Sequence, residues 1–289
     1  MRQIKRLIID NILPDWYLNI RRWRKAHGGA FPRIRRPITF NEKILHRILF
    51  ERCPIFAQVV DKAAVRSYVG ERLGPEILPT VYHLTSDPRT IPFDRLPDKF
   101  VVKPTHGSGW VKIVTDKSTL DPVALVATCA EWLKRSYYKE TREIAYKHIK
   151  PRVIIEEFIE DGSGFTPNDY RLFVFDGVVK LIQADVDRFT HHFQRFYTPE
   201  WQKIDARNAW YDVSGDAREP THLVEMIKSA EILADGWDFI RVDFYDTPHR
   251  FYFGELTLAP NAGRASFFPE EFDYYLGSLW KTRTRRGRP

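Results

Sequence analysis

The segment FVVKPTHGSGW, residues 100–110, is the most informative stretch of this 289-residue chain. An apolar strand ends at Lys103, and a loop of small residues with Gly107 and Gly109 follows it. Glycines let backbone N–H groups approach phosphate oxygens, and a lysine supplies a compact counter-charge. The pattern predicts a polyphosphate-binding hairpin over residues 99–115, although an ordinary hairpin with a surface lysine looks the same. It matches neither GxxxxGK[ST] nor GxGxxG, so those named motifs are excluded.

Two strands near the C-terminal end carry a second group of polar residues. Arg241 and Asp243 share one face of the first strand, and Glu255 and Thr257 share one face of the next. If the strands pair, two carboxylates meet within reach of a hard cation. Mg²⁺ held by one or two carboxylates plus substrate phosphates is the usual arrangement at nucleotide sites. The alternative is a surface Arg–Asp pair on an edge strand. A weaker signal is IIEEFI (residues 154–159), a strand end that presents acceptors to an adenine edge or simply enters solvent.

The rest of the pattern mixes helices with strands that pair locally. Asp176-Gly177 lies between two apolar runs and is a strong hairpin signal. The expected helices cover residues 40–52, 60–73, 121–147 and 222–235, and the expected strands cover residues 152–158, 170–175, 178–184, 238–245 and 250–258. This order predicts an α+β fold with largely antiparallel sheets.

Taken in order, these motifs resemble the ATP-grasp superfamily, and specifically its TupA-like branch, named after teichuronopeptide biosynthesis. The resemblance covers roughly residues 37–278. It is carried by FNEKI (40–44), DKAAVR (61–66), the 100–110 segment, IEE (155–157), DYR (169–171), RVDFY (241–245) and FGELT (253–257). It implies an ATP-grasp fold, in which two α+β subdomains clasp ATP, with an N-terminal helical segment in front.

The resemblance also divides the chain. The expected parts are a basic amphipathic segment (1–36), an N-terminal helical and linking region (37–97), a small lid subdomain (98–160), a C-terminal subdomain with the metal site (161–280) and a basic tail (281–289).

Residue roles follow from the same resemblance. Lys62 and Lys103 resemble the two phosphate-binding lysines. The expected lid loop over the triphosphate is His106, Gly107, Ser108 and Gly109; the expected adenine hinge is Glu156, Glu157 and Ile159, with Asp169 at the ribose. Lys103, Arg171 and Arg241 are the expected catalytic residues, Arg171 facing phosphate or acceptor and Arg241 facing the oxyanion of a tetrahedral intermediate.

Asp243, Glu255 and Thr257 occupy the positions of the magnesium ligands. The superfamily usually has Glu-x-Asn there, and Thr257 replaces the asparagine. A hydroxyl is a poorer Mg²⁺ ligand than an amide oxygen, so one metal site is expected to be weaker or filled by water. Asn261 lies four residues further on.

The implied reaction is an ATP-dependent carboxylate–amine ligation through an acyl phosphate, with ATP and Mg²⁺ as cofactors and ADP and phosphate as products. The TupA-like resemblance points to cell-surface polysaccharide biosynthesis, where an amino acid or another amine would be amide-linked to the carboxylate of a uronic acid on a sugar or glycan. Three alternatives remain open: a sugar phosphotransferase on the same fold, a glycosyltransferase or its accessory (Asp185-Val-Asp187 is a literal DxD), and a binding module without activity.

Residues 185–211 are the expected substrate region, because cationic side chains occur there among seven aromatic residues. The candidates for binding an anionic sugar are Arg188, His191, His192 and Arg195. A solvated surface loop is the alternative. The adjacent histidines lack a third ligand at recognisable spacing, so no zinc site is expected.

Positive charge lies at the two ends of the chain. The net charge is +7, but residues 1–36 carry a local +8 and residues 281–289 a local +5, so the part between them is acidic. This distribution argues against nucleic-acid binding as the main role. Residues 1–30 combine basic and apolar side chains, which suits docking on an anionic membrane surface; a helix packed on the body with its arginine face in solvent is the alternative.

Two distant cysteines and the lack of an apolar run long enough to span a bilayer predict a cytoplasmic protein, peripheral at the inner face of the plasma membrane if the N-terminal segment docks there. The sequence does not determine the oligomeric state.

Overall fold

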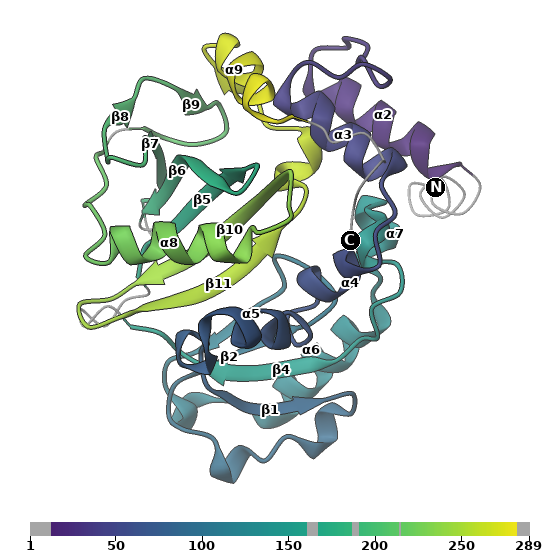
Figure 1. Cartoon of the computed structure of the whole chain (residues 1–289). Helices are drawn as coiled ribbons and strands as arrows, with labels where there is room; N and C mark the ends of the chain where they lie inside the picture. The colour runs from purple at the N-terminus through teal and green to yellow at the C-terminus, as the bar shows by residue number, and fades with distance from the viewer. Residues whose placement is uncertain (1–12, 161–166, 187–190, 214, 282–289) are drawn as a thin grey trace.

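The computed structural model describes residues 13–160, 167–186, 191–213 and 215–281. Two antiparallel sheets lie one beyond the other, with helices against both (Figure 1). The helices are α2 (Asp15–Ala26), α3 (Phe40–Phe50), α4 (Ile55–Val60), α5 (Val65–Leu73), α6 (Pro122–Lys134), α7 (Tyr137–Thr141), α8 (Leu223–Leu233) and α9 (Glu271–Leu279). The single-turn 3₁₀ helices are η1 (Pro75–Ile77), η2 (Pro88–Thr90), η3 (Phe93–Arg95), η4 (Lys117–Thr119), η5 (Ile144–Tyr146) and η6 (Pro260–Gly263).

The smaller sheet has the strand order β1-β4-β2-β3. Its strands are β1 (Val81–Thr85), β2 (Phe100–Pro104), β3 (Lys112–Val114) and β4 (Val153–Glu157). The β2–β3 pairing confirms the hairpin expected around the glycine loop. The sheet also includes β1, which pairs with β4. It therefore contains residues that precede residue 98, the expected start of the lid subdomain. Alternate side chains such as Val102 and Ile155 face α6, where Leu125 and Trp132 complete an apolar core.

The larger sheet has the order β11-β10-β5-β6-β7-β8. Its strands are β5 (Asp169–Phe175), β6 (Val178–Val186), β7 (Phe193–Tyr197), β8 (Lys203–Ile204), β10 (Phe239–Asp246) and β11 (Phe251–Thr257); β9 (Arg207–Asn208) and β12 (Phe267–Phe268) form a separate two-stranded ladder. Asp176 and Gly177 adopt positive φ angles of 47° and 78°, which confirms the predicted β5–β6 hairpin.

Opposite faces of the larger sheet bury two different cores. On β5, Leu172 belongs to a core that includes residues of α4, α5 and α8. Phe173 and Phe175 point the other way and pack with Phe40 of α3 and Trp280, which follows α9. Because side chains alternate along each strand, one face of this sheet packs against α4, α5 and α8, and the other packs against α3 and α9. The mixed helices and antiparallel sheets confirm the α+β class.

Two expected helices are broken in the structure. The helix expected over 60–73 is interrupted because the Asp61 carboxylate accepts hydrogen bonds from the backbone N–H groups of Ala63 and Ala64, which starts α5. The helix expected over 121–147 ends at Lys134, and Arg135 is extended. The Ser136 side chain then caps the start of the short helix α7, which is therefore separate from α6.

The N-terminal segment forms a helix that packs on the body. Leu18 and Trp23 of α2 are buried, whereas Trp16 is more than half exposed. Gly28 and Gly29 follow this helix with positive φ angles of 61° and 90°. Residues 1–12 and 282–289, which carry part of the terminal basic charge, lie outside the described residues. Within the described part of the chain, no helix is both long and apolar enough to cross a membrane.

Candidate functional site

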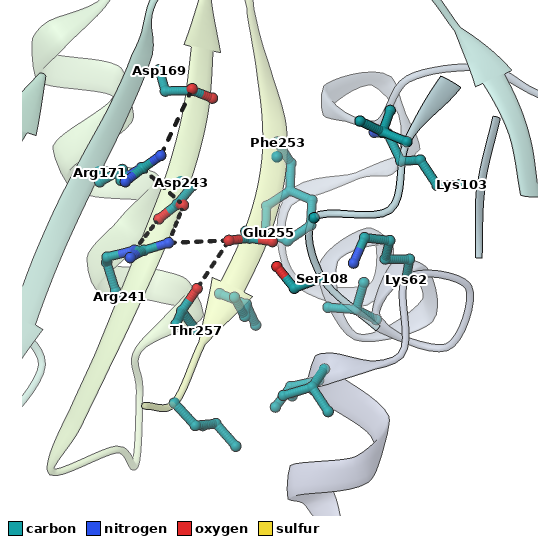
Figure 2. Close-up of a pocket in the computed structure, with 18 of the residues that line it drawn as sticks. Lys62, Lys103, Ser108, Asp169, Arg171, Arg241, Asp243, Phe253, Glu255 and Thr257 are labelled. Carbon is teal, nitrogen blue, oxygen red and sulfur yellow. Dashed lines mark hydrogen bonds and ion pairs between the residues drawn. The ribbon is translucent and has the colours of Figure 1, made fainter. Parts of the chain in front are cut away.

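A cavity of about 620 Å³ lies between the two sheets. One wall comes from β2, β4 and the loop after β2, and the other from β5, β10 and β11. Figure 2 shows Glu255 on β11 facing Ser108 and Lys62 across this space. Motifs from both halves of the sequence therefore meet in one site.

The paired carboxylates lie on the β10–β11 ladder. Asp243 pairs with Glu255 and Arg241 pairs with Thr257, which confirms the expected strand pairing. Arg241 donates two hydrogen bonds to Asp243, of 2.7 and 2.6 Å, and a third of 3.0 Å to Glu255. The Thr257 hydroxyl donates to Glu255 at 3.2 Å. Strand alternation puts Arg241 and Asp243 on the same face of β10 as Phe239, so this polar floor continues one of the apolar cores.

The two carboxylates are unequal. Burial raises the pKa of Asp243 to about 7, and the nearby Glu255 adds to this effect while Arg241 opposes it. Burial also acts on Glu255, but Arg241, Lys62 and Arg171 outweigh it and hold the pKa of Glu255 at about 2. The raised pKa of Asp243 means that the surrounding positive charge does not offset the burial of its carboxylate beside Glu255.

Two carboxylates alone make an incomplete metal site. Over residues 13–160, 167–186, 191–213 and 215–281, no group of three or more His, Cys, Asp and Glu side chains is placed to hold a metal ion. Mg²⁺ needs fewer protein ligands when phosphate oxygens complete its shell. The deficit of positive charge at Asp243 and the oxygen donors of Glu255 and Thr257 fit such a cation.

Asp185 is a site residue that the sequence reading missed. It lies on β6, is fully buried and binds Arg171 at 3.2 Å. His192 and Gln194 each lie 2.8 Å from one of its carboxylate oxygens, and the Gln183 amide donates to the other at 2.6 Å. Despite burial, these partners hold the pKa of Asp185 at about 2. The match of residues 185–187 to DxD suggested a different role. Asp185 instead lies within strand β6 and binds Arg171.

Arg171 is the cation that this acidic network surrounds. It lies 3.6 Å from Asp243 and 3.9 Å from Asp169, in addition to its pair with Asp185. Burial disfavours its charge, but Asp185, Asp243 and Asp169 together raise its pKa above the ordinary value. The guanidinium is therefore permanently charged and held in place at the cavity floor (Figure 2).

The opposite wall carries the two expected phosphate-binding lysines. Lys103 forms an ion pair with Glu156 of the neighbouring strand β4. Lys62 donates from Nζ to the Gly107 carbonyl at 2.6 Å, and burial lowers its pKa. Both ammonium groups line the cavity and are partnered by protein groups next to the glycine loop.

The expected lid residues divide into two sets. Ser108 and Gly109 line the cavity. His106 is buried behind them, with Nε2 3.2 Å from the carbonyls of both Trp132 and Arg135. It therefore anchors the base of the loop on the end of α6.

The expected adenine hinge lies at the other end of the cavity. The Glu157 carboxylate accepts a hydrogen bond of 2.9 Å from the Thr80 N–H, and the Glu157 N–H donates to the Thr80 carbonyl at 2.8 Å. Ile159 is buried and lines the cavity, as do Glu156 and Asp169. The structure thus brings the hinge, ribose, lysine and carboxylate candidates into one cavity.

The expected sugar-binding residues lie elsewhere. Arg188 is outside the described residues. His192 is bound to Asp185, and Arg195 donates to the Gly215 carbonyl at 2.7 Å. As far as the structure describes the chain, His191, His192 and Arg195 do not line the cavity, whereas the nearby Trp210 and Tyr211 do.

Several cavity residues carried no motif in the sequence. They are Tyr137, Glu143, Tyr146 and Arg264. Three of these four fall in the region that the sequence predicts as one long helix, residues 121–147. These three residues line the cavity because the helix breaks at Arg135. In the sequence, only Ser136, a residue type that caps helices, indicates this break.

Comparisons with known proteins agree with the motifs. A family model described as TupA-like ATPgrasp matches residues 42–281. The structure of D-alanine–D-alanine ligase from Bacillus anthracis complexed with ATP is similar over 70% of this chain and 55% of that one, at 20% identity and a TM-score of 0.44. The same enzyme from Helicobacter pylori is similar over 78% and 61%, at 18% identity and a TM-score of 0.44.

A third similar structure is the ADP complex of N5-carboxyaminoimidazole ribonucleotide synthetase, with 12% identity, coverage of 71% and 46%, and a TM-score of 0.41. The chain thus spans only about half to three fifths of the length of these solved proteins. No curated protein matches the sequence.

Proposed function

The chain belongs to the TupA-like ATP-grasp family, and from this premise we propose that it is an ATP-dependent ligase that joins a carboxylate to an amine. The products would be an amide, ADP and phosphate. The observation that carries the proposal is the cavity in which Lys62 and Lys103 face Arg241, Asp243 and Glu255.

The nucleotide would lie along the cavity from the hinge to the carboxylates. Its adenine would contact the backbone near Glu157 and Ile159, and its ribose Asp169. Its phosphates would replace the Gly107 carbonyl and the Glu156 carboxylate as partners of Lys62 and Lys103. Ser108 and Gly109 would cover the phosphates and exclude water, which would otherwise hydrolyse an activated acid.

Asp243 and Glu255 would hold Mg²⁺, with the Thr257 hydroxyl directly or through a water. When bound, the ion neutralises phosphate charge during phosphoryl transfer. Arg241 would then exchange part of its contact with the two carboxylates for the oxyanion that forms when the amine attacks. Arg171, fixed by Asp185, would orient the acid or its phosphate from the cavity floor.

The acid is proposed to be first phosphorylated by ATP to an acyl phosphate. The neutral amine nitrogen then attacks the acyl carbon, and the carbon–oxygen bond to phosphate breaks. The nitrogen loses one proton, and the departing phosphate takes it up. No side-chain nucleophile is required. The lysines, Arg241 and Arg171 supply charge stabilisation at successive points of this sequence.

A uronic-acid-type carboxylate on a sugar or glycan is the proposed acid, in cell-surface polysaccharide biosynthesis. The family resemblance supports this, while the fold alone does not fix a substrate. Trp210 and Tyr211 at the cavity edge offer apolar faces on which a sugar ring could stack. Arg188, His191, His192 and Arg195 remain predicted contacts for a larger glycan outside the cavity.

The proposed location is the cytoplasm, at the inner face of the plasma membrane. Trp16 and Phe31 are 57% and 76% exposed beside the basic side chains of α2 and the segment after it. Aromatic and basic side chains together favour an anionic membrane surface. The burial of Leu18 and Trp23 means that α2 would dock while staying packed on the body.

A coupling assay tests the activity. The full chain is incubated with ATP, Mg²⁺, glucuronic-acid glycosides and individual amino acids, and products are read by mass spectrometry together with phosphate release. The expected result is a product heavier by an amide-linked amino acid, with phosphate release that needs both the acid and the amine. Phosphorylation of the sugar without an amine would instead identify a phosphotransferase and overturn the ligase proposal.

A further inference from the structure

Two oppositely charged cavity residues remain without a salt bridge in the part of the chain that the structure describes. Glu143 and Arg264 both line the cavity. Within the described residues, neither makes a salt bridge: Glu143 hydrogen-bonds Thr141, and Arg264 donates from Nε to the Asn261 carbonyl at 3.2 Å. The terminal nitrogens of Arg264 and the Glu143 carboxylate are therefore available to a ligand.

Both residues follow backbone that is in an unfavourable conformation. Arg142, directly before Glu143, has φ of 65°. Asn261 and Ala262, shortly before Arg264, have φ of 51° and 52°. Non-glycine residues in the left-handed region cost free energy, and such positions concentrate at functional sites. Each of these two turns is followed by a charged residue that lines the same cavity.

Each strained turn is held by tertiary contacts. Arg142 pairs with Asp15 of α2 at 3.2 Å, and its carbonyl accepts a hydrogen bond of 3.2 Å from the Asn19 side chain. The turn before Arg264 lies against α3, so closely that a Cβ on Gly263 would come within 2.6 Å of the Asn41 carbonyl. The positions of Glu143 and Arg264 are therefore fixed by the fold.

The charges of Glu143 and Arg264 interact electrostatically. Burial raises the pKa of Glu143 to about 7, and Arg264 partly lowers it. They are thus close enough to interact electrostatically, yet they do not form a salt bridge. Because both residues line the same cavity, a small ligand with one positive and one negative group would complement the pair.

Tyr137 connects this pair to the proposed reaction centre. Its hydroxyl hydrogen-bonds Ser108 of the lid loop and interacts electrostatically with Glu143, Glu255 and Arg264. Its ring packs against Tyr146 with the centroids 4.6 Å apart. Arg264 follows β11 on the side of Glu255 and Thr257 away from the hinge, which is the side that a phosphoryl acceptor and its amine partner would occupy.

We propose that Glu143 and Arg264 form the binding site of the amine substrate, which is an amino acid bound as a zwitterion with its ammonium group at Glu143 and its carboxylate at Arg264. This rests on the proposed ligase function and adds the residues that select its second substrate. Tyr137 and Tyr146 form the apolar side of this amino-acid site.

Ligand-observed saturation-transfer NMR on the full chain tests the proposal. The twenty L-amino acids and D-alanine are each probed with and without Mg²⁺ and AMP-PNP, together with their methyl esters and N-acetyl derivatives. We expect at least one amino acid to bind and both of its derivatives to lose binding, because each derivative removes one of the two charges.

Variants assign that binding to the two residues. Glu143→Gln and Arg264→Gln should each weaken amino-acid affinity at least tenfold and leave AMP-PNP affinity within twofold of the parent. Arg264→Lys should retain part of the affinity. The exposed Glu131→Gln and Arg250→Gln serve as charge-matched controls, and thermal unfolding verifies that each variant is folded.

Three results would overturn the inference: no amino acid binds although AMP-PNP does, the methyl ester binds as well as the parent, or neither variant weakens binding. Failure of AMP-PNP itself to bind would refute the proposed function. The amino-acid measurements without nucleotide would still decide on this site, so the two failures are distinguishable.

Discussion

Asp243 and Glu255 are direct partners across the β10–β11 ladder, and the single guanidinium of Arg241 hydrogen-bonds both. Asp243 is buried, and this burial together with the nearby charge of Glu255 raises its pKa although Arg241 and Arg171 lie close to it. This relationship is what makes the floor of the cavity suited to Mg²⁺ and phosphate.

Replacing Asp243 should therefore weaken magnesium dependence. We expect Asp243→Asn to raise the Mg²⁺ concentration for half-maximal ATP turnover at least tenfold, about 1.4 kcal/mol, because one of two carboxylate ligands is lost. The exposed Asp94→Asn is the control. An unchanged magnesium titration in a folded Asp243→Asn protein would remove Asp243 from the metal site.

Lys103 should contribute to nucleotide affinity. Lys103→Met keeps the length of the side chain and loses its charge, so we expect the Kd for Mg²⁺-ATP to rise at least tenfold by calorimetry, about 1.4 kcal/mol. Lys112, exposed on the adjacent strand β3, provides a matched Lys→Met control that should bind normally. Equal affinities in the two variants would contradict a phosphate contact at Lys103.

Asp185 should be important for stability as well as for the position of Arg171. Asp185→Asn leaves the buried Arg171 without its closest counter-charge, and breaking a buried ion pair costs about 3 kcal/mol. Urea unfolding should show this loss, whereas Asp235→Asn on the surface should stay within about 0.5 kcal/mol of the parent. A loss below about 1 kcal/mol would mean that Asp185 is not essential to the network.

Two helical glycines should respond to alanine in opposite directions. A Cβ on Gly277 of α9 would lie 2.1 Å from the Ile38 carbonyl oxygen, so Gly277→Ala should destabilise the protein by about 1–3 kcal/mol. Gly70 of α5 has no atom within 4 Å of the added carbon, so Gly70→Ala should stabilise it by up to about 1 kcal/mol. Thermal unfolding compares the two, and equal effects would refute the close packing of α9 on residues 38–40.

Glu143 should make stability depend on pH. Its pKa is about 7 in the folded protein and 4.5 as the ordinary value. Between these values the folded state keeps a proton that the unfolded state has released, so stability falls as pH rises from 4.5 to 7 and levels off above. Glu143→Gln lacks this loss, and its unfolding free energy relative to the parent should increase by about 2 kcal/mol between pH 5 and pH 8, allowing for partial solvent exposure.

The measurement is urea unfolding at both pH values without nucleotide, with Glu131→Gln as the control that should give a constant difference. A constant difference for Glu143→Gln as well would show that this carboxyl titrates normally. Binding of an amino acid should reduce the effect, because an ammonium group beside Glu143 lowers its pKa.

The ordered motifs of the sequence by themselves indicated the family. Local patterns predicted the α+β class and placed Asp243 and Glu255 on neighbouring strands. These follow from local signals: strand alternation, the turn at Asp176-Gly177 and the glycine loop after Lys103 each depend on a few neighbouring residues. The same locality explains the errors, since the apolar spacing of 121–147 continues across a break that is set by Ser136.

Only the tertiary structure decided which charges meet. Asp185 joins Arg171 because β5 and β6 are in one particular register, and His192 hydrogen-bonds Asp185 from the side of the neighbouring strand β7. Glu143 and Arg264 reach one cavity because packing against α2 and α3 holds residues before them at positive φ. Such backbone conformations are stable only when distant segments enforce them, and no local pattern in the sequence records that enforcement.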